Sequence, residues 1–348
     1  MRPARSYWVR LLLASTAVLL LAACATFERA APFAAQGGAA WPGPPDPPRL
    51  QYVTQFSGTA DLGIRPSAWS RIVSFVSGPG DRAMQRPMAV AATPAGDTVF
   101  VADPGAGVVH RYDLVRGRYD RLTPGRGTAL ASPVGLAVTA DGRVFVADSA
   151  LNAVLSAGPE DDALQPLALT PEPEQPTGLA LGPSGDLFVA STGSHTIRRY
   201  SAAGTLLREY GGRGSAPGQL NFPTYLWLES PSELLVTDTL NFRIQRFDAD
   251  NGVLGAFGQA GDASGSLARP KGVAVDRHGN IYVMDGVLNA LQVFDREGRL
   301  LLAFGEQGQG PGQFWLPSGI FVTPDDLVFV ADSYNRRVQV FRYLGDTP

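Results

Sequence analysis

The sequence repeats one phrase six times, and this repeat restricts the fold more than any other feature. Each copy opens with proline, usually followed two positions later by glycine, and continues into an apolar strand. A second strand then ends in a Val-Ala-Asp-like triplet. Successive prolines lie 43 to 47 residues apart; they are Pro87, Pro133, Pro176, Pro223, Pro270 and Pro317. One small sheet cannot bury both of its faces, so repeats of this length with several short strands predict stacked propeller blades.

The composition of the copies agrees with blades of antiparallel strands. Val, Ile and Phe fill the strand segments in alternation, as a pleated sheet requires. Glycine-containing turns at 140–142 and 183–185 are suited to join the first two strands as hairpins. With 40 Gly and 28 Pro in 348 residues, the chain suits one large all-β domain rich in turns.

The clearest copy, Pro317-Ser-Gly319 followed by Val-Phe-Val-Ala-Asp332 and Asn335, resembles the NHL-repeat family. The resemblance covers about residues 50–348, with weaker copies where Ala89 replaces glycine and Ser191 replaces aspartate. It implies an all-β fold, a six-bladed β-propeller of four-stranded antiparallel blades.

Closure of the ring requires a strand from the other end of the chain. The sequence stops just after the third strand of the last copy, while residues 49–56 have the length and pattern of the fourth strands elsewhere. We therefore predict that this N-terminal strand closes the ring and removes an exposed edge. Residues 62–86 lie outside the repeat, and 67–76 could form a short amphipathic helix that either plugs one end of the ring or binds a partner.

The first 23 residues predict a signal peptide rather than part of the propeller. A basic segment precedes the apolar stretch 11–21, and Leu21-Ala-Ala-Cys24 resembles a bacterial lipobox. The resemblance implies cleavage before Cys24 and acylation of this single cysteine; an ordinary secretory signal or an uncleaved anchor is the alternative. Ala25 follows the cysteine, which by the family rule implies the outer membrane, with the protein facing the periplasm of a bacterial cell envelope.

Residues 24–49 are rich in Pro, Ala and Gly and predict a semi-stiff tether between the lipid anchor and the propeller domain 50–348. Removal of the leader, which has three Arg and no acidic residue, changes the formal net charge from −3 to −6. This acidic balance argues against a nucleic-acid partner.

Enzyme chemistry finds little support in the sequence. Propellers similar to this family include a zinc-dependent amidating lyase and calcium lactonases, so a metal-dependent hydrolase or lyase with a site in the central channel is the alternative function. The three histidines, His110, His195 and His278, fall at repeat positions on opposite faces and cannot share a metal. We expect no metal and no cofactor. Gly-rich segments 211–218 and 305–312 lie at blade junctions, not between a strand and a helix, so they do not predict a nucleotide site.

The repeated carboxylates and amides are expected to hold tight turns rather than a metal. These predicted turn caps are Asp103, Asp148, Asp238, Asp285, Asp332, Asn241 and Asn335.

Residues that break the repeat on the face of the blade-to-blade loops are the candidates for recognition, because the fold itself does not require them. This predicted partner-binding face comprises Tyr225, Arg269, Lys271, Trp315 and Tyr334. Trp227 and Phe321 also break the repeat and are expected to fill space between blades. We predict a monomeric, membrane-anchored lipoprotein whose propeller is a non-enzymatic scaffold for an unidentified protein or envelope polymer.

Overall fold

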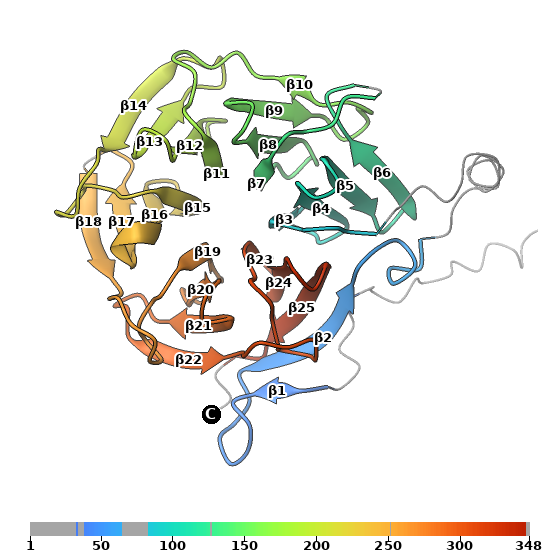
Figure 1. Ribbon diagram of the computed structural model, residues 1–348, viewed down its shortest axis with the longest axis vertical. Helices are drawn as coiled ribbons and strands as arrows, with labels where there is room; N and C mark the ends of the chain where they lie inside the picture. The colour runs from blue at the N-terminus through green and yellow to red at the C-terminus, as the bar shows by residue number, and fades with distance from the viewer. Residues whose placement is uncertain (1–32, 34–37, 65–82, 126, 251, 346–348) are drawn as a thin grey trace, which may run out of the picture. The chain divides into compact units, whose positions relative to one another are not determined.

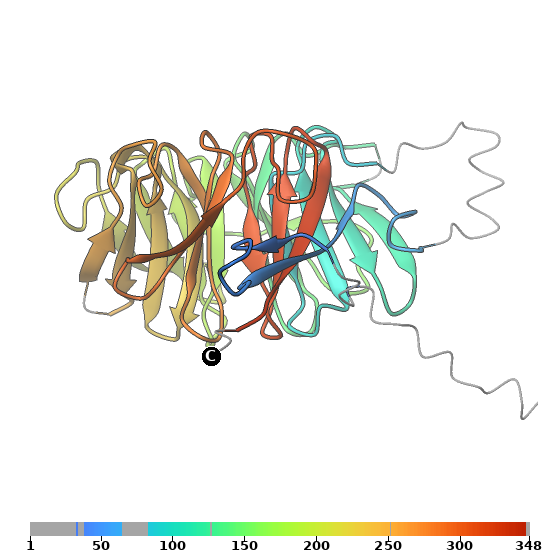
Figure 2. The same cartoon turned by 90° about the horizontal axis from the view of Figure 1, so that it is seen from below.

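Six antiparallel sheets are arranged in a ring, as the repeat predicts (Figure 1), and form a disc when the ring is seen from its side (Figure 2). The computed structural model describes residue 33 and residues 38–64, 83–125, 127–250 and 252–345. Apart from Phe33, these residues all belong to one compact unit, Ala35–Pro348.

Each sheet is one blade, and in blades 1 to 5 the strands follow one another in chain order from the axis outward. Blade 1 is β3 (Ala89–Ala92), β4 (Thr98–Asp103), β5 (Val108–Asp113) and β6 (Arg118–Leu122). Blade 2 is β7 (Pro133–Val138), β8 (Val144–Asp148), β9 (Ala153–Ala157) and β10 (Gln165–Pro166). Blade 3 is β11 (Pro176–Leu181), β12 (Leu187–Ser191), β13 (Thr196–Tyr200) and β14 (Leu206–Gly211). Blade 4 is β15 (Pro223–Ser230), β16 (Glu233–Asp238), β17 (Arg243–Asp248) and β18 (Gly252–Phe257). Blade 5 is β19 (Pro270–Val275), β20 (Ile281–Asp285), β21 (Ala290–Phe294) and β22 (Leu300–Phe304). In the described residues the one helical element is a 3₁₀ turn, η1 (Thr239–Asn241).

Blade 6 joins the two ends of the chain, which confirms the predicted closure. Its inner strands are β23 (Ile320–Val322), β24 (Leu327–Asp332) and β25 (Arg337–Tyr343). The N-terminal strand β2 (Leu50–Phe56) lies antiparallel to β25, with Leu50 opposite Tyr343 and Phe56 opposite Val338 (Figure 1).

A fifth strand extends blade 6 into the segment assigned to the tether. Strand β1 (Ala40–Trp41) pairs with β2, so the folded domain begins before residue 50. The Trp41 ring stacks on Phe304 of blade 5 with centroids 4.5 Å apart. Gly312 makes room for it, because a Cβ there would come within 2.2 Å of the indole. Trp41 thereby fastens the end of the tether across the junction of blades 5 and 6.

The glycine of the repeated Pro-x-Gly lies where inner strands of neighbouring blades approach most closely. A Cβ at Gly135 would lie 1.6 Å from the carbonyl oxygen of Thr177 in the next blade. At the equivalent place in blades 5 and 6, the N–H of Gly272 donates to Ser318 O at 3.0 Å and the N–H of Gly319 donates to Met88 O at 2.9 Å. In these blades a side chain at this position would push the two backbones apart, whereas Ala89 in blade 1 and Tyr225 in blade 4 occupy the equivalent position.

Buried apolar side chains between adjacent sheets form the core. Phe100 of blade 1 and Val146 of blade 2 belong to one such cluster, and Tyr282 and Phe341 belong to the cluster of blades 5 and 6. The predicted signal peptide, Cys24 and the predicted helix at 67–76 lie outside the described residues. Over the described ranges, the structure has no helix that is both long enough and apolar enough to span a bilayer.

We predict that Gly135→Ala lowers the free energy of unfolding by about 3 kcal/mol or more, because the added methyl group forces two inner strands apart. Gly255→Ala is the matched control: Gly255 lies in an outer strand, and a Cβ there has nothing within 4 Å. That variant should be neutral or more stable by up to about 1 kcal/mol. Urea unfolding measures both, and equal stabilities would contradict the role given to the repeated glycine.

Candidate functional site

Buried carboxylates at the ends of the second strands organise one face of the ring. Asp285 is fully buried and accepts four backbone N–H groups. Two come from the loop entering its blade, Ala268 and Arg269, each at 2.8 Å, and two from the turn that follows, Val287 and Leu288, each at 3.0 Å. Asp148 has the same arrangement with its own loop and turn. These carboxylates have no free lone pairs directed toward solvent.

In blades 4 and 6, side-chain donors replace some of the backbone N–H groups that bind the aspartate in blades 2 and 5. Asp332 accepts from Asn335 Nδ2 at 2.8 Å, from Arg337 Nε at 2.8 Å and from Gln339 Nε2 at 3.1 Å. Asp238 has the corresponding Asn241, Arg243 and Gln245. Asn241 and Asn335 also donate to carbonyl groups of the preceding loop, Gly214 O and Gly308 O.

In blade 1 a histidine occupies the position of this glutamine. His110 Nε2 lies 3.2 Å from Asp103 Oδ2, and both side chains are fully buried. Burial by itself would raise the pKa of Asp103, but the hydrogen bonds from His110 and from the N–H groups of Gln85 and Arg86 lower it below its ordinary value. The group is a hydrogen-bonded structural carboxylate.

A hydroxyl after the strand end fastens each of several blades to the next. Thr192 Oγ1 donates to Pro223 O at 2.5 Å, Thr239 Oγ1 to Pro270 O at 3.2 Å, and Ser333 Oγ to Pro87 O at 2.6 Å, which closes the ring. Blades 1 and 5 lack this hydroxyl, because Pro104 and Gly286 occupy the position.

A cavity of about 340 Å³ opens on this face, beside the two blades that lack the hydroxyl. We call it the loop-face basin. Blades 1, 2, 5 and 6 form its walls, which include Arg86, Ser132, Arg269, Lys271, Ser318 and Tyr334. Pro104 and Gly286 also line it, and a Cβ at Gly286 would approach Pro317 O to 3.1 Å and Lys271 Cγ to 3.5 Å.

Three cationic side chains of the basin have no anionic partner. Within the described ranges, no carboxylate forms an ion pair with Arg86, Arg269 or Lys271, and no acidic residue lines the cavity. Burial lowers the pKa of Lys271, and the neighbouring positive charge of Arg269 lowers it further, while Asp285 partly offsets the effect. The basin is therefore a concentration of positive charge that the fold does not neutralise.

An exposed aromatic pair borders the basin. The rings of Trp315 and Tyr334 lie 5.7 Å apart at 40°, and the two residues are 40% and 49% exposed. Leu316 and Val287 lie in the basin wall beside them and are 39% and 51% exposed. Exposed aromatic and aliphatic residues next to unpaired charges are typical of a binding surface.

Tyr225 lies beneath the basin and crosses the channel axis. Its hydroxyl donates to Met88 O of blade 1 at 2.6 Å and lies 2.9 Å from Ser318 Oγ of blade 6. Burial raises the pKa of the phenol to about 12. Tyr225 is a structural strut across the ring, and its hydroxyl is not available to a partner.

Below Tyr225 the channel contains an apolar cavity of about 230 Å³, lined by the inner strands of all six blades. Trp227 of blade 4 and Phe321 of blade 6 meet there edge to face, with centroids 5.5 Å apart. Trp227 packs against the core between blades 4 and 5 and against the core between blades 5 and 6, which agrees with the expectation that it fills space between blades. Its contact with Phe321 was not expected, because blade 5 lies between the two. Its equivalent residue is the small Ala274, which leaves room for the two rings to meet.

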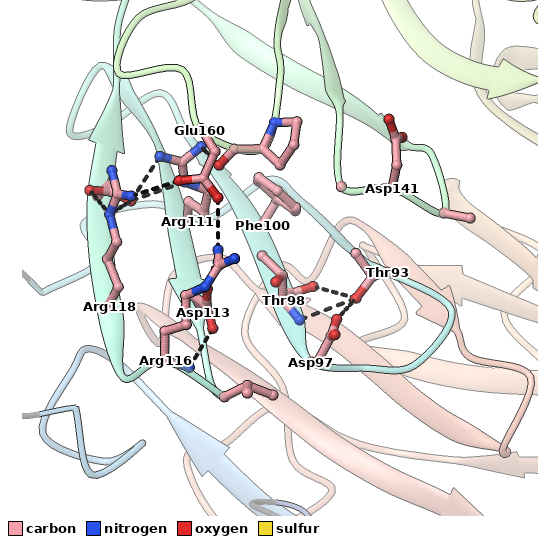
Figure 3. Close-up of a pocket in the computed structure, with 15 residues that line it drawn as sticks. Thr93, Asp97, Thr98, Phe100, Arg111, Asp113, Arg116, Arg118, Asp141 and Glu160 are labelled. Atoms are coloured by element: carbon pink, nitrogen blue, oxygen red, sulfur yellow. Dashed lines mark hydrogen bonds and ion pairs between the residues drawn. The ribbon is translucent and has the colours of Figure 1, made fainter.

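Another cavity of about 340 Å³ lies between blades 1 and 2 and differs from the basin in its charges (Figure 3). Each of its three arginines has an acidic partner: Arg111 with Asp120 at 2.8 Å, Arg116 with Glu160 at 2.9 Å, and Arg118 with Asp162 at 3.1 Å. Arg111 also donates to Pro159 O of blade 2 at 2.8 Å. The pairs of Arg116 and Arg118 and the bond from Arg111 to Pro159 join blades 1 and 2. This cavity is therefore a weaker candidate for ligand binding than the loop-face basin.

The histidines have structural surroundings. His110 lies in β5 with Asp103 and Tyr119, His195 Nδ1 accepts the N–H of Phe222 at 3.1 Å, and His278 lies 3.6 Å from Asp326. Across the described part of the chain, no three His, Cys, Asp or Glu residues lie together as a metal site would require.

The structure brings together most of the residues predicted for the partner-binding face. Arg269, Lys271 and Tyr334 line the basin, and Trp315 packs on Tyr334. Tyr225 lies beneath, engaged with the wall residues Met88 and Ser318. Sequence reasoning missed Arg86, although it precedes Pro87 just as Arg269 precedes Pro270, and this shared position was the available signal.

Comparison with known proteins supports the fold. A family model described as the Teneurin NHL domain matches residues 123–315, and one described as the NHL repeat matches residues 314–341. No curated protein sequence matches the chain.

Similar solved structures include enzymes and a binding protein. A streptogramin B lyase is 17% identical with a TM-score of 0.56, over 75% of this chain and 94% of its own. An auxiliary nutrient binding protein from Bacteroides ovatus is 15% identical with a TM-score of 0.59, over 74% and 69%. A putative gluconolactonase is 16% identical with a TM-score of 0.55, over 75% and 89%. At these identities the likeness shows the fold alone.

Proposed function

The chain belongs to the family of the Teneurin NHL domain, and we propose that it is a lipid-anchored scaffold of the bacterial cell envelope that binds a protein or envelope polymer at the loop-face basin. The observation that supports this most is the clustering of Arg86, Arg269 and Lys271 without anionic partners beside the exposed Trp315–Tyr334 pair. Neither the charges nor the exposed rings contribute to closing the ring.

Electrostatic considerations support binding rather than structure. Lys271 is partly buried, and a partly buried cation without a counter-charge costs free energy in the folded state, because it loses hydration. Arg86 and Arg269 are exposed and remain open to an anionic partner. Some arginines elsewhere in this protein are paired within their blade, as Arg199 is with Asp186 at 2.6 Å and Arg243 with Asp238 at 2.8 Å. Among the described residues, exposed arginines such as Arg213 and Arg336 also form no ion pair, but the basin brings three unpaired cations together. A set of cations left unpaired at one place is what recognition of an anionic partner requires.

Anchoring at Cys24 is part of the same proposal and is supported by the lipobox-like sequence. Several acyl chains, each methylene contributing about 0.8 kcal/mol when buried, hold a protein firmly at a membrane. The tether from Cys24 to the strand at Ala40 then keeps a monomeric propeller near the outer membrane, facing the periplasm.

The alternative is a metal-dependent hydrolase or lyase, and the fold is compatible with either class, since similar structures include a lyase and a putative gluconolactonase. We favour the scaffold because the basin places unpaired cations beside exposed aromatic rings, an arrangement suited to binding.

Loss of the aromatic pair should abolish partner binding. Photo-activated cross-linking in intact cells, followed by purification, should recover a specific partner with the native protein and lose it with Trp315→Ala combined with Tyr334→Ala. The matched control is Leu207→Ala with Leu254→Ala on outer strands, where the residues are 54% and 56% exposed. A partner retained by the aromatic variant, or lost equally by the control, would contradict the assignment of this face.

Acylation predicts a change of compartment when the cysteine is removed. Cys24→Ser should abolish incorporation of radiolabelled palmitate and shift the protein from the membrane to the soluble fraction. The control is Ser15→Ala within the leader, which should leave both unchanged. Labelling of the Cys24→Ser variant at the native level would refute lipid attachment at this residue.

A further inference from the structure

The positive charges of the basin all come from residues that flank the repeated prolines. Each proline has one residue before it and one after it, twelve positions in all, and these contain three cations and no acidic residue. All three cations, Arg86, Arg269 and Lys271, line the loop-face basin. Equivalent positions in blades 3 and 4 carry Thr177 and Thr224, whose hydroxyls lie 2.7 Å from Thr192 and Thr239 and serve blade packing.

The carboxylates nearest to these three cations already accept hydrogen bonds from other groups. Asp285 lies behind Arg269 and Lys271, but it accepts four backbone N–H groups and is fully buried. Asp103 behind Arg86 accepts the N–H groups of Gln85 and Arg86 and pairs with His110. Only the backbone of Arg86 and Arg269 is engaged in these contacts, so both guanidinium groups are left for a ligand.

The size of the basin restricts the ligand to a compact unit. Its volume of about 340 Å³ is at the lower end of the range for small-molecule sites, roughly 300–1,000 Å³. Such a volume holds one ring with its substituents, not a helix or a folded segment. An anionic group would satisfy the cations, because the planar Arg fork matches a carboxylate and Lys adds a point charge.

The aromatic part of the basin wall favours a ligand that contains a ring. Tyr334 lines the basin, and Trp315 packs against it, so together they present exposed aromatic surface with polar edges. A pyranose ring carries apolar C–H groups on its face and can place a carboxylate at its edge, which suits an aromatic wall beside cations. Ser132 and Ser318, which also line the basin, supply hydroxyl groups for the ring's own hydroxyls.

We propose that the loop-face basin binds an acidic sugar residue of an envelope polymer, with its carboxylate on Arg269, Lys271 and Arg86 and its ring against Tyr334 and Trp315. This assignment rests on the proposed scaffold function and narrows its partner to an anionic glycan.

Lys271 is the only lysine of the chain, which provides a direct probe. Reductive methylation with ¹³C-formaldehyde of the detergent-solubilised protein keeps the positive charge of Lys271 and gives one lysine dimethyl signal. Glucuronate should shift the lysine signal in a saturable manner and raise the pKa of Lys271, since a bound anion stabilises its charged form. Glucose, which lacks the carboxylate, and acetate, which lacks the ring, should each bind at least tenfold more weakly.

A charge-matched pair of variants tests the assignment of the site. Arg269→Gln should weaken glucuronate binding about tenfold, because one charged hydrogen-bonding group is lost, and it retains the backbone N–H that holds Asp285. Arg213→Gln, an exposed position outside the basin, should leave binding within twofold. No saturable shift with glucuronate, equal binding of acetate or inorganic phosphate, tighter binding of triglutamate, or equal loss in both variants would each overturn the acidic-sugar site.

The two proposals fail separately. If the native protein captures a partner that the Trp315→Ala, Tyr334→Ala variant loses, but glucuronate gives no shift, the scaffold function stands and the acidic-sugar ligand is wrong. If glucuronate binds as described but no partner is captured, the sugar site stands and the scaffold function is wrong.

Discussion

The close approach of inner strands at the repeated glycine is the constraint on which the rest of the molecule depends. Six sheets can surround one axis only if their innermost backbones nearly touch, and Gly135 shows the limit, with 1.6 Å between an added Cβ and the neighbouring carbonyl. Direct hydrogen bonds from Gly272 and Gly319 then tie blades 5, 6 and 1 together. With the inner strands in place, the buried aspartates hold the entering loops of five blades, blade 3 having Ser191 instead, and the face of the disc acquires a fixed shape.

The candidate site arises where this pattern has exceptions. Pro104 and Gly286 stand where three other blades have a hydroxyl that fastens the next blade, and the space beside them is the loop-face basin. Tyr225 replaces a glycine and crosses the axis, which separates the basin from the apolar cavity below. Cations that the fold does not use gather in this basin, whereas those of the cavity between blades 1 and 2 are all paired (Figure 3). Pairing, and not cavity size, distinguishes the two.

The fold and the number of blades could be predicted from the sequence because the same pattern of strands and turns occurs six times. The closing strand could be predicted because the last copy of the repeat has only three strands and needs a partner for its outer edge. The docking of Trp41 was not predictable, since it depends on the shape left by Gly312, far along the chain. Sequence comparison among the copies found Arg269, Lys271, Trp315 and Tyr334 as exceptions. It could not show that Tyr225 is a strut or that Trp227 meets Phe321, because contacts across a ring axis leave no local pattern.

The central claim is that the cations of the basin serve binding and not stability, and urea unfolding at pH 7 tests it directly. Burial and Arg269 lower the pKa of Lys271 from 10.5, so the fold disfavours its charge; this cost is present below the lowered pKa and vanishes above 10.5. At pH 7 the combined variant Arg86→Gln, Arg269→Gln and Lys271→Gln should therefore be as stable as the native protein or more stable. A loss of more than about 1 kcal/mol in the free energy of unfolding would show that these charges hold the propeller together.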